Sequence, residues 1–370
     1  MSSRRLTRPL IGSIAMLVMP VAIAAHSDAL FAGNCELRTL LRHVYLREPR
    51  EGVECASMPL ATDIPSLAIG LSCAVAVLVY YATRNHLETV DLDMRASGLV
   101  PGRTPLIVSF ETRVMRSEKR WWYALVGLGI ALLGVYFYID VSRTSPWARF
   151  IGFYMGGNPE IVLGNWWASA DDPLALFSWI TVGCLGAWYA LLHARLNLRL
   201  ITRLNRIAER HETRYLPRHS DGQHGWAPFE KVFNLILIGS ANFVLALVPI
   251  AYLLTRGSNS LTSSLLVLAV GLFGGFACLT LIVKTIGFVR KSFGSAWEKQ
   301  AAQLDRVSKS GRKSSAMAAR MDRAEMGAPG GFPLGGPWKR MVQAIAVATA
   351  LAYAASISVL GSWVIRGIFG

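Results

Sequence analysis

Long uninterrupted runs of apolar residues divide the chain, and polar segments separate them. Six runs reach the roughly 18 residues that a helix needs to cross the hydrocarbon core of a bilayer. They occupy residues 64–82, 121–139, 174–192, 233–254, 261–283 and 341–365. Apolar residues are continuous in these runs and do not alternate with polar ones, which predicts helices and excludes barrel strands. The predicted fold is an all-α integral membrane protein, a polytopic bundle of six or seven transmembrane helices.

A seventh and shorter apolar run lies within residues 1–25. Three arginines precede it, and the small-x-small sequence Ala22-Ile23-Ala24 follows it, which is typical of a cleavable secretory signal. The same run also fits an uncleaved first transmembrane helix, although Pro20 and the short length weigh against that interpretation. Under both interpretations the next segment, residues 26–63, lies on the outer side of the membrane.

The segment 26–63 is predicted to be a small extracytoplasmic unit that precedes the six-span bundle of residues 64–370. Its two cysteines, Cys35 and Cys55, are the only ones predicted outside the membrane and the cytoplasm. Because an oxidising compartment favours disulfides, we expect a bond between them. Two free thiols, or pairing with a partner protein, are the alternatives.

The charge of the chain is distributed unevenly between the two sides of the predicted membrane. The 370 residues are 53% hydrophobic and carry a formal net charge of +15. With the N-terminus in the cytoplasm, 29 of the 38 lysines and arginines fall on the cytoplasmic side and 8 on the outer side. Cytoplasmic loops collect positive charge, so loops 83–120, 195–231 and 290–340 are predicted to be cytoplasmic and the C-terminus outside. This asymmetry accounts for most of the net positive charge without requiring that the protein bind nucleic acid.

The signal-like start and the Arg/Ala-rich composition indicate a bacterial inner membrane.

Two of these cytoplasmic loops have a helical pattern. Five arginines recur at steps of four, four, three and four, and on a helix they form one stripe: Arg195, Arg199, Arg203, Arg206 and Arg210. The sequence therefore predicts that the helix of span 174–192 continues into the cytoplasm. The stripe is a candidate site for anionic lipid, nucleic acid or an acidic partner, and the alternative is ordinary positive-inside charge. Residues 291–326 are also predicted to be helical, with an interruption near Ser310-Gly311.

Few residues in the sequence indicate chemistry. His219, Asp221 and His224 are close enough in sequence to ligate a metal, but their spacing matches no strong motif, so a turn is the preferred interpretation. No cofactor is predicted.

His193 is assigned to the end of a span, and ionisable residues within the spans are nearly absent. Trp166 and Trp167 are expected at the membrane interface, where aromatic side chains gather.

These patterns favour a non-enzymatic membrane protein over an enzyme. The first hypothesis is a subunit that anchors, assembles or senses through its basic cytoplasmic loops. Its expected partners are membrane lipids and other membrane subunits or further copies of the chain. The second hypothesis is a channel or transporter for an unidentified solute, which a polar cavity between the spans would support.

Overall fold

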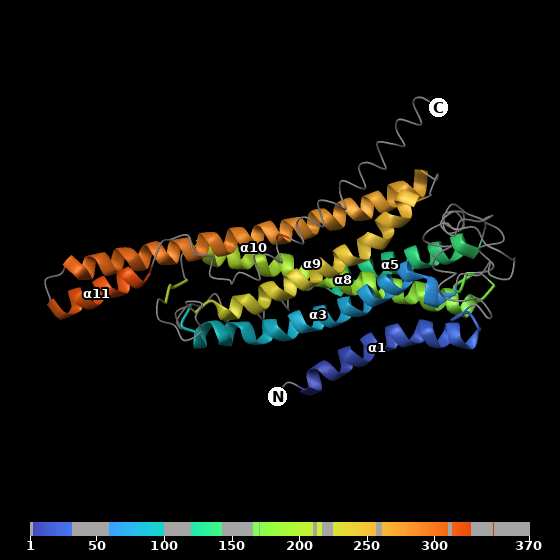
Figure 1. Ribbon diagram of the computed structural model, residues 1–370, viewed down its shortest axis with the longest axis horizontal. Helices are drawn as coiled ribbons and strands as arrows, with labels where there is room; N and C mark the ends of the chain where they lie inside the picture. Colours follow the sequence, from blue (N-terminus) through green and yellow to red (C-terminus); the bar gives the residue numbers. More distant parts are fainter. Residues whose placement is uncertain are drawn as a thin grey trace, which may run out of the picture.

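The computed structural model describes residues 3–31, 59–99, 120–142, 166–169, 171–209, 213–216, 225–256, 261–309, 313–326 and 343. These residues form helices that run along the long axis of the molecule, with no strand among them (Figure 1). The elements are α1 (Ser3–His26), the 3-10 helix η3 (Leu60–Thr62), α3 (Ile64–Ala96), α5 (Arg120–Ser142), α8 (Pro173–Glu209), α9 (Ala227–Arg256), α10 (Leu261–Lys309) and α11 (Lys313–Glu325). The all-α prediction is confirmed for this part of the chain.

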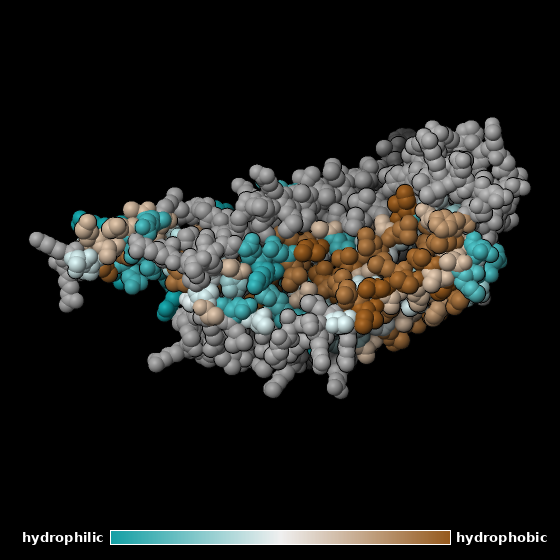
Figure 2. Space-filling model, turned by 60° about the horizontal axis from the view of Figure 1, so that its bottom comes forward, coloured by the Kyte–Doolittle hydropathy of each residue, from teal (hydrophilic) through white to brown (hydrophobic). Residues whose placement is uncertain are grey.

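Three helical segments of the described chain are long and apolar enough to cross a membrane. They are Pro9–His26, Ser66–Leu87 and Pro173–Thr202, and Tyr123–Tyr136 is a shorter apolar segment. Figure 2 shows hydrophobic residues gathered in one band across the molecule, with hydrophilic residues on both sides of it. The total of six or seven spans stays a prediction, because nearly all of the predicted last span, 341–365, lies outside the described residues.

Helix α3 lies at the centre of the bundle, packed against α1, α8 and α9. Small and polar residues allow these helices to approach one another closely. The hydroxyl of Ser13 in α1 donates a hydrogen bond to the carbonyl of Ala74, and Asn242 Nδ2 in α9 donates to the carbonyl of Ser72 over 2.8 Å. A Cβ atom on Gly186 of α8 would overlap Cys73. The packed position of α1 fits a first transmembrane helix, and whether residues 1–25 are cleaved stays a prediction.

Segments that are far apart in sequence meet at the two ends of the bundle. At one end, called here the tryptophan end, the amide of Leu60 donates to the carbonyl of Ala29, and Trp166 packs near them. At the other end, called the hairpin end, the amide of Arg214 donates to the carbonyl of Leu99 over 2.8 Å. Parts of all three loops predicted to be cytoplasmic lie at the hairpin end (Figure 1).

Aspartates cap the N-termini of two central helices at the tryptophan end. Asp63 Oδ1 accepts the amide of Ser66 in the first turn of α3, and Asp172 Oδ1 accepts the amides of Leu174 and Ala175 in the first turn of α8. Both are N-caps, which satisfy amides that have no partner inside the helix. Burial raises the pKa of Asp172, but hydrogen bonds from Ser27 and these amides outweigh it and hold the pKa below its usual value.

Two helices are much longer than a bilayer is thick. At 1.5 Å per residue, the 37 residues of α8 extend about 55 Å and the 49 residues of α10 about 74 Å, against a hydrocarbon core of about 30 Å. The predicted continuation of the helix beyond span 174–192 is therefore confirmed through Glu209. The predicted break near Ser310 matches the end of α10 at Lys309 and the start of α11 at Lys313.

Candidate functional site

The most distinctive feature outside the bundle is a helical hairpin made by the second half of α10 and by α11. We define the hairpin as residues 297–326. Helix α11 folds back along α10 and packs against it (Figure 1). Trp297, Ala301 and Leu304 are spaced by four and three residues, so they lie on one face of α10, and all three are buried. Ala319 of α11 and Met326, the residue after α11, belong to the same hydrophobic cluster.

Polar contacts fix the register of the hairpin. The guanidinium of Arg323 lies over the Trp297 ring, 4.7 Å from its centroid, and also contacts Asp305 Oδ1 at 3.5 Å. The indole N–H of Trp297 donates to the carbonyl of Met326 over 3.3 Å. The ion pair is largely exposed, so it contributes little. The buried indole contributes more, because it combines packing, a cation–π contact and a hydrogen bond.

The outward surface of the hairpin is basic and partly apolar. Lys and Arg outnumber Asp and Glu seven to four in residues 297–326. Arg306 and Arg320 are exposed. Met317 is 68% exposed and Met321 54%, and they lie one helical turn apart on α11. Methionine adapts its shape readily and is frequent at docking surfaces. This surface can receive an acidic partner that also offers an apolar contact.

An aromatic cluster, called here the basal cluster, connects the hairpin to the bundle. It comprises Trp226, Phe229, Phe233, Phe288 and Phe293, from the start of α9 and the middle of α10. Their neighbouring ring centroids lie 5.3 to 6.3 Å apart, within the usual range for aromatic pairs. Trp226, Phe233 and Phe288 are fully buried. These packed rings join the middle of α10, just before the hairpin, to the start of α9.

Non-helical segments complete the junction. Thr213 donates from its hydroxyl to the carbonyl of Ser292 in α10, and the Tyr215 ring packs edge-on against Phe293 at 5.4 Å. Burial raises the pKa of the Tyr215 hydroxyl. Gly225 has a φ of +88°, a conformation that side chains with a Cβ rarely adopt, and Leu216 packs directly on it. The loop after α8 is thereby tied to α10.

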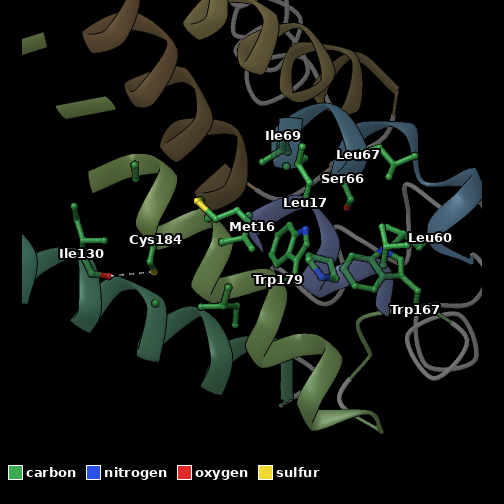
Figure 3. Close-up of a pocket in the computed structure, with 18 of the residues that line it drawn as sticks. Met16, Leu17, Leu60, Ser66, Leu67, Ile69, Ile130, Trp167, Trp179 and Cys184 are labelled. Atoms are coloured by element: carbon green, nitrogen blue, oxygen red, sulfur yellow. Dashed lines mark hydrogen bonds between the residues drawn. The ribbon is translucent and has the colours of Figure 1, made fainter. Parts of the chain in front are cut away.

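A second feature, an apolar cavity of about 250 Å³, lies among α1, α3, α5 and α8 near the tryptophan end (Figure 3). Met16, Trp167 and Val182 in its wall are buried, whereas Leu67 and Leu133 at its rim are 40% and 55% exposed. The cavity is therefore open to the outer surface of the bundle on its rim side and is not an enclosed void.

A third feature is a buried polar cluster among α3, α8 and α9. His193 Nε2 lies 3.2 Å from Thr83 Oγ1 and 2.8 Å from Asn197 Nδ2. The imidazole packs on Gly239, where a Cβ atom would overlap the ring. The side chains of His193, Thr83 and Asn197 are at most 8% exposed. The sequence assigned His193 to the end of a span, so this interior position was missed; the four-residue spacing to Asn197 was the available signal.

We find no match to this chain among protein-family models, curated proteins or solved structures.

The arginine stripe lies on the extension of α8. Arg195 is half-buried, with its guanidinium 5.0 Å from the centroid of the Tyr123 ring in α5, and Arg199 is also half-buried. Arg203 and Arg206 lie within the helix, and Arg210 lies just outside the described residues. Leu196 and Leu200, which lie on the same helix, are buried. The first arginine thus packs within the protein, while anionic-partner binding by the stripe stays a prediction.

Other predicted site residues lie outside the described part of the chain. These are Cys35 and Cys55 of the proposed disulfide and His219, Asp221 and His224 of the weak metal candidate. Cys73 and Cys184, whose side chains the structure describes, are free. Among the described residues no group of three His, Cys, Asp or Glu side chains is placed to hold a metal ion.

The tryptophans before α8 pack inward, whereas the sequence indicated only that they lie at the membrane interface. Trp166 and Trp167 are 5% and 2% exposed. Both indole N–H groups donate to Asp63 Oδ2 over 2.9 Å. The physical reason is that a buried carboxylate needs donors, and two adjacent indoles supply them while their rings fill the core.

Proposed function

We propose that this chain is a non-enzymatic membrane subunit that anchors an acidic partner protein through the α10–α11 hairpin. The observation that carries the proposal is the continuity of α10. One helix of 49 residues includes the predicted span 261–283 and then forms half of the hairpin. A surface built on such a helix is fixed relative to the membrane, as an anchoring or assembly subunit requires.

The proposed orientation places the hairpin in the cytoplasm of a bacterial cell. The excess of Lys and Arg in the three loops that meet at the hairpin end supports this orientation, because cytoplasmic loops collect positive charge. The C-terminus and the tryptophan end then lie outside. Under this orientation the hairpin faces cytoplasmic proteins, and the arginine stripe lies near the anionic inner leaflet.

The surface of the hairpin defines the chemistry of the partner. Arg306 and Arg320 are exposed and supply charge, and Met317 and Met321 supply an apolar contact. Complementary charge raises the association rate and selects the orientation of the partner, and buried apolar area slows dissociation. The proposed partner therefore has an acidic face with an apolar centre.

The alternative function, a channel or transporter, is favoured by one observation, the buried cluster of His193, Thr83 and Asn197. Polar groups inside a membrane bundle often mark a solute or proton pathway. In the described structure, however, this cluster is enclosed by three helices. The cavity that lies closer to the tryptophan end has an apolar wall in which Ser66 supplies a hydroxyl. The docking hypothesis is thus the better supported of the two.

The experiment is a comparison of copurifying proteins from the native membrane in mild detergent. The double variant Arg306→Gln/Arg320→Gln removes two exposed charges from the hairpin. The matched control, Lys284→Gln/Arg290→Gln, removes two exposed charges from the part of α10 that precedes the hairpin. Quantitative mass spectrometry should find a protein that is retained by wild type and control, released by the hairpin variant, and released from wild type as salt rises. Equal retention by both variants refutes the proposal.

A further inference from the structure

We propose that the apolar cavity among α1, α3, α5 and α8 is a binding site for one acyl chain of a membrane phospholipid. The cavity lies within the part of the bundle formed by the apolar segments Pro9–His26, Ser66–Leu87 and Pro173–Thr202. Its rim residues Leu17, Leu67 and Leu133 are 37% to 55% exposed and belong to the apolar surface that faces lipid. The cavity is therefore continuous with the membrane interface, and an acyl chain can enter from the bilayer.

The chemistry of the wall selects hydrocarbon over water. A buried water needs two to four polar partners, and the wall supplies one side-chain hydroxyl, that of Ser66. The remaining surface consists of aliphatic, sulfur and indole groups. In Figure 3 the Met16 side chain and the Trp179 and Trp167 rings border the space. The volume of about 250 Å³ exceeds the roughly 150 Å³ of an apolar cavity that admits benzene, so a segment of alkyl chain fits.

Glycines on two helices keep the space open. Gly70 of α3 and Gly183 of α8 both line the cavity, and a Cβ atom added at either would meet no atom within 4 Å. Larger residues at these positions can therefore occupy the cavity without displacing the backbone. The Trp167 indole, held by Asp63, lies at the tryptophan end of the space, the level at which indoles accompany lipid headgroups. The headgroup of the bound lipid then lies toward this end.

The test uses the full chain in vesicles of phosphatidylethanolamine and phosphatidylglycerol that contain a phosphatidylethanolamine with a photoactivatable diazirine on one acyl chain. After irradiation, mass spectrometry should find the label on residues 66–70 and 179–184. The variant Gly70→Leu/Gly183→Leu should lose this label. The control Gly129→Leu, on an exposed position of α5 that also has open space but lies outside the cavity wall, should keep it.

Several outcomes would overturn the assignment. Label that persists in the filled variant indicates ordinary lipid around the protein. Absence of label from the cavity wall in wild type indicates that another part of the chain or another protein occupies the space. If the double variant fails to fold, the phospholipid content of the purified wild-type protein is the test. A site of this kind must retain a phospholipid per chain through purification in mild detergent. This site lies away from the hairpin, so its failure and the failure of the docking proposal are independent results.

Discussion

The guanidinium of Arg323 lies 4.7 Å from the centre of the Trp297 ring, across the contact between α11 and α10. The same indole donates its N–H to the carbonyl of Met326, at the end of α11. One side chain of α10 thus holds both the last turn of α11 and the residue that follows it. The short contact surface of a 13-residue helix depends strongly on this anchor, because isolated helices of that length are marginal in water.

Replacing the anchor should release α11 while the bundle stays folded. Trp297 is 8% exposed, and Trp→Ala changes at buried positions cost about 3 kcal/mol or more. Trp297→Ala should therefore accelerate hydrogen exchange in residues 313–325 by about 100-fold. The control Met317→Ala, at a position 68% exposed, should leave exchange unchanged. Wild-type protection of α11 in the Trp297→Ala protein would show that the hairpin is held by other contacts.

The hairpin illustrates what the sequence could predict. The apolar run and the break near Ser310 were sufficient to predict two helices, since both are local properties of the chain. The fold-back of α11 was not predicted, because Ala301 and Ala319 are small residues with no distinctive hydrophobic pattern. Their pairing depends on the distance between two helices, which sequence spacing alone does not give.

A second prediction concerns Asp63, which accepts both Trp166 and Trp167 and caps α3. Asp63→Ala leaves two buried indole N–H groups without a partner, at about 1–3 kcal/mol each, and removes an N-cap at about 1 kcal/mol. Thermal unfolding in detergent should therefore occur at a much lower temperature. Asp63→Asn should be intermediate, because its single oxygen serves either the indoles or the helix.

The control for this pair of variants is Asp171→Asn at a neighbouring exposed position. An exposed change away from such contacts alters stability by less than about 0.5 kcal/mol. An unfolding temperature for Asp63→Ala equal to that of the control would contradict the assigned role. The sequence showed Asp63 before a predicted span and two tryptophans before another, but nothing in it linked segments separated by a hundred residues.

A third prediction compares two glycines in long helices. Gly239→Ala should destabilise the protein by about 1–3 kcal/mol, because its methyl group would overlap the His193 ring. Gly287→Ala, at an exposed position of α10 with open space, should instead stabilise α10 by up to about 1 kcal/mol. Denaturation in detergent measures both.

A double-mutant cycle tests the cause. Removing the ring in Gly239→Ala/His193→Ala should relieve part of the cost of Gly239→Ala, so that the two changes are not additive. If the free-energy changes of the two substitutions add, the cost of Gly239→Ala does not come from overlap with the His193 ring. The sequence could not predict this contact, since no pattern in the sequence pairs a position of α8 with a position of α9.

The disulfide between Cys35 and Cys55 lies outside the described residues and stays a prediction from the sequence. Alkylation of the denatured protein without reductant should label Cys73, Cys184 and Cys278 and leave Cys35 and Cys55 unlabelled. Removing the bond in Cys35→Ser should lower stability by about 3 kcal/mol in the chain-entropy model. Full alkylation of all five cysteines before reduction would rule out the bond.

The proposed function requires that the outward surface of the hairpin contact a protein in the cell. Its most direct test places a photocrosslinking amino acid at Met317 and, as a control, at Phe276, which is 66% exposed on α10 within the predicted span 261–283. Irradiation of intact cells should convert the Met317 form to a discrete protein adduct, lost on adding Arg306→Gln/Arg320→Gln. The Phe276 form should give none. Equal or absent adducts at the two positions would contradict docking through the hairpin.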